Sequence, residues 1–284
     1  MPEEALAAWF AQRRRDLPWR RTRDPWAVLV SEVMLQQTQV DRVVPRWQRF
    51  LARFPTVDAC GDAGPGAVVE EWAGLGYNRR ALNLWRCAAV VCEQHGGAFP
   101  DDPDGLLALP GVGPYTARAV LAFAFERDVG VVDTNVGRVL ARRAGRRLTA
   151  REVQAAADAV VPAGRGWSHN QAMLDLGATV CTARRPVCGS CPVRATCAWS
   201  RSGCDGPDPA AGSAGVSGGQ SRFAGSDRQG RGRLVEALRA GPVATADLAA
   251  VMGWPSEPAR AAAVAATVVA DGLAVFADGS YRLP

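Results

Sequence analysis

Four cysteines lie close together about two-thirds of the way along the chain, in the pattern C-x6-C-x2-C-x5-C: Cys181, Cys188, Cys191 and Cys197. These gaps are short enough for one stretch of chain to wrap around a single small inorganic group. Four thiolates without a histidine among them suit an iron–sulfur cluster, and a zinc ion is the alternative. The cysteine run therefore predicts that this part of the chain folds around a metal site.

The 284-residue sequence is long enough for roughly two domains. It contains no run of about 18 apolar residues, so no membrane partner is expected. Its first residues, Met-Pro-Glu-Glu, lack the pattern of a secretory signal. We expect a cytoplasmic, nucleoid-associated protein of a bacterium. In that reducing setting, clustered cysteines bind metals more often than they form disulfides.

All 33 basic side chains are arginine, and the formal net charge is +5. This modest excess is a weak indication of a polyanionic partner. The absence of lysine has a sharper consequence, because no lysine side chain is available to form a Schiff base.

Residues 1 to about 200 carry apolar positions at helical rather than alternating spacing, which predicts a mainly α fold. The expected helices cover residues 3–15, 26–35, 42–53, 65–73, 79–95, 103–108, 114–127, 133–143, 150–161 and 168–178. Residues 201–226 are rich in Gly, Pro and Ser, and this composition predicts a flexible linker. In residues 227–284, three helices precede two strands around Asp278-Gly279, which predicts a small winged-helix-like α+β domain.

The segment Leu-Pro-Gly-Val-Gly-Pro-Tyr-Thr-Ala at 109–117 lies between two expected helices. Gly111 and Gly113 permit backbone angles that other residues avoid, and Pro114 suits the first turn of the following helix. The free N–H groups at that helix start are suited to a DNA phosphate. This segment resembles the helix–hairpin–helix of the DNA glycosylase superfamily that includes endonuclease III, and the cysteine spacing resembles the 4Fe-4S loop of that superfamily.

The resemblance implies a two-lobed fold. Residues 1–22 and 129–200 would form a 4Fe-4S cluster domain that uses all four cysteines of the run. Residues 23–128 would form a six-helix barrel domain. Arg184 and Arg185, in the first loop of the cysteine run, would contact DNA phosphates and add affinity without sequence specificity.

The segment from Pro25 to Val40, which contains Ser-Glu-Val-Met-Leu-Gln-Gln-Thr-Gln-Val, resembles that of the adenine DNA glycosylases of the MutY type. Trp-Ala-Gly-Leu-Gly-Tyr at 72–77, Val-Asp-Thr-Asn-Val at 132–136 and Asn-Gln-Ala-Met at 170–173 also match, in the same order. Membership of that family implies double-stranded DNA with a mispaired adenine as the partner. The adenine would lie opposite 8-oxoguanine or guanine, and the default state is a monomer.

The resemblance also assigns the chemistry. Glu32 would be the general acid that protonates the leaving purine, with a pKa raised by its apolar neighbours. Asp133 would remain ionised at a helix start and stabilise the oxocarbenium-like sugar. Asn135 would orient the sugar or water, and Tyr115 would lie near both carboxyl groups. Because Tyr115 stands where the bifunctional lyases of the superfamily carry lysine, we expect a monofunctional glycosylase.

Adenine must leave the helical stack before it can react. By the same resemblance, Gln171 would recognise the extruded base and Arg20 would line its pocket. Tyr77 would wedge into the duplex, and Gln36 and Gln37 would line the gap that the base leaves.

Two alternatives remain open. A thymine or uracil mismatch glycosylase of the same superfamily can also carry tyrosine after the hairpin, and a non-catalytic DNA-binding protein can retain the scaffold. About 60 residues follow the expected linker, which is too few for the Nudix-like domain of many adenine glycosylases. The preference between 8-oxoguanine and guanine opposite adenine is therefore left open.

Overall fold

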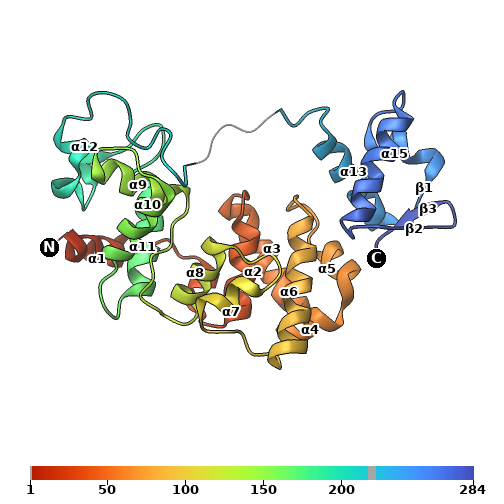
Figure 1. Cartoon of the computed structure of the whole chain (residues 1–284), viewed down its shortest axis with the longest axis horizontal. Coiled ribbons are helices and arrows are strands. Elements are labelled where there is room, and N and C mark those ends of the chain that lie inside the picture. Colours follow the sequence, from red (N-terminus) through yellow and green to blue (C-terminus); the bar gives the residue numbers. More distant parts are fainter. Residues whose placement is uncertain (1, 217–221) are drawn as a thin grey trace. The chain divides into compact units, whose positions relative to one another are not determined.

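The computed structural model describes residues 2–216 and 222–284 and is predominantly helical (Figure 1). The chain divides into two compact units, each assembled from segments that are distant in the sequence. Unit 1 draws its described residues from Met1–Val28, Asp101–Asp104 and Gly113–Gly219, and unit 2 from Leu29–Pro100, Gly105–Val112 and Gln220–Pro284. Helices α2 (Pro25–Leu35) and α7 (Pro103–Ala108) cross the boundary between the units.

The α-helices of unit 1 are α1 (Pro2–Arg13), α8 (Pro114–Phe123), α9 (Thr134–Ala144), α10 (Ala150–Ala159), α11 (Gly166–Thr179) and α12 (Ala198–Arg201). Helices α1, α9, α10 and α11 share one apolar core, while α8 packs against α11 and α12 against α9. Residues 136–142 of α9 and 169–173 of α11 are buried without a break, so these two helices lie at the centre of unit 1 and are covered on more than one face. The core includes Leu6, Phe10, Leu140, Met173 and Leu176.

The N-terminal part of unit 2 packs α4 and α5 against α6. Its α-helices, besides those that cross the boundary, are α3 (Val40–Arg53), α4 (Val57–Asp62), α5 (Gly64–Glu71) and α6 (Arg79–His95). The rings of Phe50 and Trp72, both fully buried, meet edge to face with centroids 6.0 Å apart. Such pairs add stabilisation beyond the area that they bury.

The C-terminal part of unit 2 combines three α-helices with a small antiparallel sheet (Figure 1). The helices are α13 (Asp227–Ala240), α14 (Leu248–Met252) and α15 (Pro258–Ala270). The sheet has the strand order β1 (Val243–Ala244), β3 (Ser280–Arg282) and β2 (Val275–Ala277). Tyr281 pairs with Val243 on one side and with Phe276 on the other. The expected fold class, mainly α with a small C-terminal α+β region, is confirmed.

Three local differences from the sequence-based expectations have clear physical causes. Helix α4 was not expected, although Thr56 caps it by accepting a hydrogen bond from the Ala59 N–H at 3.1 Å. Strand β1 is only two residues long and is defined by its pairing with β3 rather than by a pattern of its own. The third difference concerns the expected linker.

Part of residues 201–226 is packed rather than flexible. Asp208 forms an ion pair with Arg142 of α9 at 2.6 Å, and Ala210 and Ser213 are almost fully buried. The Ala214 N–H donates to the Leu148 carbonyl at 2.9 Å. Small residues bury little area each, which explains why composition alone missed this contact with unit 1. Residues 217–221, which belong to the predicted flexible linker, lie outside the described residues.

None of the helices in the described ranges is both long and apolar enough to span a membrane.

Candidate active site

Asp133 lies at the N-terminus of α9, where its carboxylate caps the helix. The Val136 N–H donates to Oδ1 at 2.7 Å, and the Asn135 side-chain nitrogen donates to Oδ2 at 2.8 Å. The Asn135 side-chain oxygen in turn accepts from Arg138 Nη2 at 2.8 Å. Because this bond fixes which end of the Asn135 amide faces Asp133, the three side chains form one oriented series in unit 1.

Burial raises the pKa of Asp133 above its ordinary value. The hydrogen bonds from Val136 and Asn135 and the charge of Arg138 act in the opposite direction, because each stabilises the carboxylate. The helix N-terminus predicted an ionised Asp133 from sequence, and the burial seen in the structure opposes that effect.

Helix α11 supplies Gln171, which is 4% exposed, and the neighbouring Asn170. Asn170 accepts from the Val131 N–H and donates to the Val129 carbonyl, both at 2.8 Å. It therefore holds the extended segment that leads into Asp133. In the sequence, Asn170 appears only as part of the 170–173 motif, and nothing local indicates this structural role.

Arg20, expected in the base pocket, is tied to Asp175 of α11. Its two terminal nitrogens donate to the two carboxylate oxygens, both at 2.8 Å. Arg15 adds two further donors to the same carboxylate. The Arg20 Nε atom is buried and has no hydrogen-bond partner. Asp175 is fully buried and was not singled out in the sequence.

The two glycines of the hairpin differ. Gly111 has φ +77°, and a Cβ there would come within 2.7 Å of the Asn83 Cβ, so glycine is required on both counts. Gly113 has φ −98° and does not need glycine for its conformation, which corrects the expectation. A Cβ on Gly113 would meet no atom within 4 Å, so the surface beside this N-cap of α8 is open. Tyr115, in the first turn of α8, is half-buried.

The remaining predicted base-contact residues belong to unit 2. Glu32 is 5% exposed on α2. Gln36 and Gln37 follow the C-terminal end of α2, and Gln37 is exposed with φ +57°. Tyr77 is 45% exposed with φ +48°. Since Glu32 lies in unit 2 and Asp133 in unit 1, the approach of these two carboxyl groups stays a prediction.

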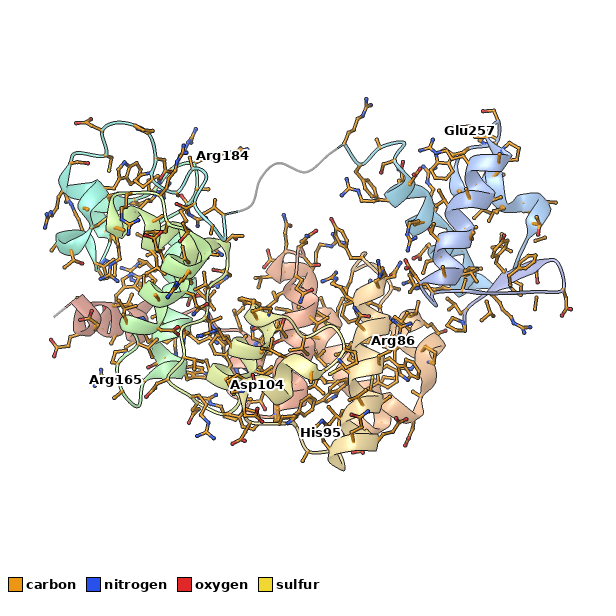
Figure 2. All side chains as sticks on the ribbon, in the orientation of Figure 1. Arg86, His95, Asp104, Arg165, Arg184 and Glu257 are labelled. Atoms are coloured by element: carbon orange, nitrogen blue, oxygen red, sulfur yellow. The ribbon has the colours of Figure 1, made fainter. Side chains whose placement is uncertain are left out.

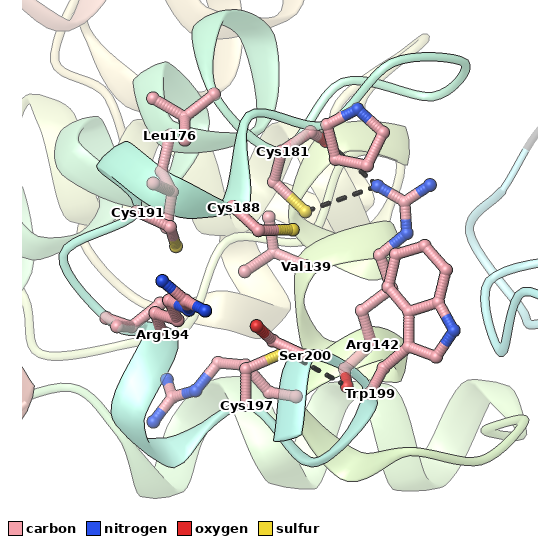
Figure 3. A pocket seen from close by; sticks show the side chains of 14 residues that line it. Val139, Arg142, Leu176, Cys181, Cys188, Cys191, Arg194, Cys197, Trp199 and Ser200 are labelled. Atoms are coloured by element: carbon pink, nitrogen blue, oxygen red, sulfur yellow. Dashed lines mark hydrogen bonds between the residues drawn. The ribbon is translucent and has the colours of Figure 1, made fainter. Parts of the chain in front are cut away.

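The four cysteines of the run line one pocket in unit 1, with walls formed by Val139, Leu176 and Val180. Figure 3 shows the labelled cysteines arranged around this common space. Among the described residues, no group of three or more Cys, His, Asp or Glu is gathered closely enough to hold a single metal ion. The metal site predicted from the cysteine run would lie in this pocket.

Arg142, on α9, is 1% exposed and lines this pocket. It donates to the Cys181 Sγ at 3.3 Å (Figure 3). It also donates to the Thr182 carbonyl at 2.8 Å. Its guanidinium stacks over Trp199 at 4.7 Å. A positive donor beside a thiolate ligand stabilises its charge. Nothing in the local sequence pattern around Arg142 indicates that its side chain faces the cysteine loop.

A fifth thiol lies near the run, since Cys204 Sγ is 4.0 Å from Cys188 Sγ. Arg184 and Arg185 extend from the first loop of the run, and both are exposed (Figure 2 labels Arg184). The loop thus presents two arginines to solvent, and their contact with DNA phosphates stays a prediction.

Comparisons with known proteins show the family of this chain. A model of the HhH-GPD superfamily, base excision DNA repair proteins, matches residues 30–163. The adenine DNA glycosylase of Mycolicibacterium smegmatis is 43% identical over 286 residues, which cover 98% of this chain and 94% of that protein.

Two solved structures share the fold. A thermostable thymine-DNA glycosylase has a TM-score of 0.65 and 28% identity, over 70% of this chain and 95% of that one. Endonuclease III trapped as a covalent intermediate with DNA has a TM-score of 0.62 and 25% identity, and the match covers 72% of this chain and 95% of that one. The chain belongs to the HhH-GPD superfamily of base excision DNA repair proteins and, within it, to the adenine DNA glycosylase family.

Proposed function

We propose that this chain removes adenine from double-stranded DNA in which the adenine is mispaired with 8-oxoguanine or guanine, and that it hydrolyses the N-glycosidic bond without cutting the strand. The near full-length similarity to a protein named adenine DNA glycosylase carries the substrate assignment. The proposal that the strand is not cut rests on the sequence, which contains no lysine and has Tyr115 after the hairpin.

In this reaction Glu32 protonates the leaving adenine, so that the base departs as a neutral group. Glu32 is only 5% exposed, so its carboxyl group is shielded from bulk water. Asp133, oriented by Val136 and Asn135, stabilises the positive charge that develops on the sugar. The Arg138–Asn135 hydrogen bond keeps the Asn135 amide in place while that charge forms.

The experiment that tests this proposal uses matched duplexes that carry A·8-oxoguanine, A·G, T·G or U·G. We expect base release from the first two only, and strand breaks only after alkali. Release of thymine or uracil alone would favour the alternative suggested by the thymine-DNA glycosylase fold. Tight binding without release from any duplex would identify a non-catalytic protein, and strand breaks without alkali would contradict monofunctional chemistry.

A 4Fe-4S cluster, held by Cys181, Cys188, Cys191 and Cys197, is part of the proposal. The apolar walls of the pocket and the Arg142 donor suit a buried cluster with anionic ligands. Bound there, it would cross-link the loop that presents Arg184 and Arg185 to the DNA backbone. No electron transfer is needed for hydrolysis, so we assign the cluster a structural role.

Protein purified without oxygen is expected to contain about four iron and four sulfide per chain, with broad visible absorbance. Cys191→Ser should lose most of both, and its melting temperature should fall. Cys92→Ser, outside the pocket, is the matched control and should keep its iron. One zinc per chain and no sulfide in the wild-type protein would contradict the cluster.

A further inference from the structure

Arg80 stands out in unit 2 because its half-buried guanidinium group bonds to two separate stretches of chain. Its Nη1 atom contacts three carbonyl oxygens at the C-terminal end of α2: Val33 at 2.7 Å, Met34 at 2.9 Å and Gln36 at 2.6 Å. The last carbonyls of a helix have no partner within the helix and carry the negative end of its dipole. Arg80 therefore caps the helix that bears Glu32.

The Nη2 atom of Arg80 binds the second stretch. It donates to the Leu75 carbonyl at 3.2 Å and the Gly76 carbonyl at 3.1 Å, immediately before Tyr77. It also donates to Thr38 Oγ1 at 3.1 Å. The Arg80 guanidinium carbon lies 5.6 Å from the centre of the Tyr77 ring. One side chain thus joins the end of α2 to the turn that carries Tyr77.

No carboxylate among the described residues forms a salt bridge with Arg80; its acceptors are carbonyl and hydroxyl oxygens. Burial lowers the pKa of Arg80 to about 10, and Tyr77 acts in the opposite direction. The side chain is therefore still charged at neutral pH. A half-buried charge compensated by carbonyl and hydroxyl dipoles is sensitive to the positions of those dipoles, so Arg80 and the two segments hold one another in place.

Backbone conformation shows that both segments need such support. Gln37 and Tyr77 have φ values of +57° and +48°, a region that non-glycine residues seldom adopt. Conformations of this kind persist where surrounding contacts enforce them, and they concentrate at functional sites. Arg80 bonds to the residue before each of them, Gln36 and Gly76.

We infer that Arg80 is a positioning residue for DNA penetration: it sets the exposed Tyr77 ring and the Gln36–Gln37 turn at the fixed separation that lets both enter a duplex together. This inference rests on the proposed function, since it concerns how the mispaired adenine is extruded. It assigns no contact with the reacting atoms to Arg80.

Lysine cannot replace Arg80 in this role. Arginine presents donors on two separate nitrogens in a rigid plane, whereas lysine presents its donors on a single atom. A lysine at position 80 retains the charge but reaches only one of the two segments. Arg80→Lys therefore separates geometry from electrostatics.

The matched control is Arg79→Gln. Arg79 is the preceding residue of α6, and its side chain is 70% exposed with an ion pair to Asp271 at 3.7 Å. The Arg79→Gln substitution removes one positive charge next to the same turn and leaves the Arg80 hydrogen bonds intact. Any general loss of attraction to DNA phosphates should appear in this variant.

The test places the fluorescent base 2-aminopurine beside the adenine of an A·8-oxoguanine pair, where its emission rises when the stack opens. For Arg80→Lys and Arg80→Gln we expect a smaller rise on binding and a single-turnover excision rate lower by about 10- to 100-fold. Affinity for an undamaged duplex should resemble that of Arg79→Gln. Melting temperatures are measured for all variants, and Arg80→Lys keeps the test valid if Arg80→Gln unfolds.

Combining Arg80→Lys with Tyr77→Ala separates a positioning role of Arg80 from a general contribution of Arg80 to stability. If Arg80 acts through Tyr77, Arg80→Lys should add little to the loss caused by Tyr77→Ala. Additive losses, or Arg80 variants that match Arg79→Gln in both readouts, would overturn the inference. A wild-type protein that neither opens the stack nor releases adenine would instead refute the proposed function.

Discussion

Replacement of Glu32 by glutamine is expected to slow adenine excision about 10²- to 10⁴-fold in single-turnover assays, the usual contribution of a general acid. Glutamine has nearly the same shape, so the packing of Glu32 beside the fully buried Val30 and Met34 should survive. It has no carboxyl proton to transfer to the purine. Affinity for the A·8-oxoguanine duplex and the melting temperature should therefore stay close to wild type.

Two comparisons make the Glu32 result specific. The control Glu70→Gln removes a carboxyl group that is 51% exposed and paired with Arg53 at 3.0 Å, and it should excise adenine normally. In Glu32→Gln, the residual rate should rise as the pH falls, because protons from solution can then protonate the adenine. Near wild-type excision by Glu32→Gln would mean that another group is the acid.

The parts of the candidate site that could be predicted from the sequence are those whose residues lie close together along the chain. Asp133 is followed three residues later by the N–H that it caps, and the four cysteines lie within one short run. Gly111 stands out as a glycine between two helices, and its positive φ follows from that turn. In each case the chemistry depends on residues only a few positions apart.

The side chains that the sequence did not reveal act across long distances in the chain. Arg80 bonds to acceptors 42 to 47 residues away as well as to the nearby turn, and Asn170 bonds to residues about 40 positions earlier. Their partners are mostly backbone carbonyl and N–H groups, which every residue carries. Sequence patterns therefore cannot mark these pairs, and only the folded chain identifies them.

Replacement of Asp175 by asparagine is expected to destabilise the protein by about 3–5 kcal/mol, the usual cost of removing one partner from a buried ion pair. Asp175 is fully buried, and the Arg20 side chain that it binds is 6% exposed. Asparagine would leave the Arg20 charge without a counter-ion. A fall in melting temperature of roughly 10 °C should result.

The control Asp16→Asn makes the same change in an exposed pair with Arg21, whose side chains are 68% and 76% exposed. A surface pair contributes about 0–1 kcal/mol, so its melting temperature should hardly change. Equal effects of the two substitutions would contradict the importance of the buried pair.

The pH dependence of stability follows from the same pair. Burial raises the pKa of Asp175, but Arg20 and Arg15 outweigh it and hold the pKa below its ordinary value. The stabilisation is complete above the unfolded pKa of about 3.9 and is lost as the pH falls through the lower folded pKa. The difference between wild type and Asp175→Asn in urea unfolding should thus shrink only in acid.

A paired replacement separates the structural role of Arg20 from its predicted role in the base pocket. Replacing a buried ion pair by apolar residues of similar volume is often neutral, so Asp175→Leu with Arg20→Met should recover part of the stability lost in Asp175→Asn. If Arg20 also lines the adenine pocket through its unpartnered Nε atom, this stable double variant should still excise slowly. Recovery of both stability and excision would limit Arg20 to a structural role.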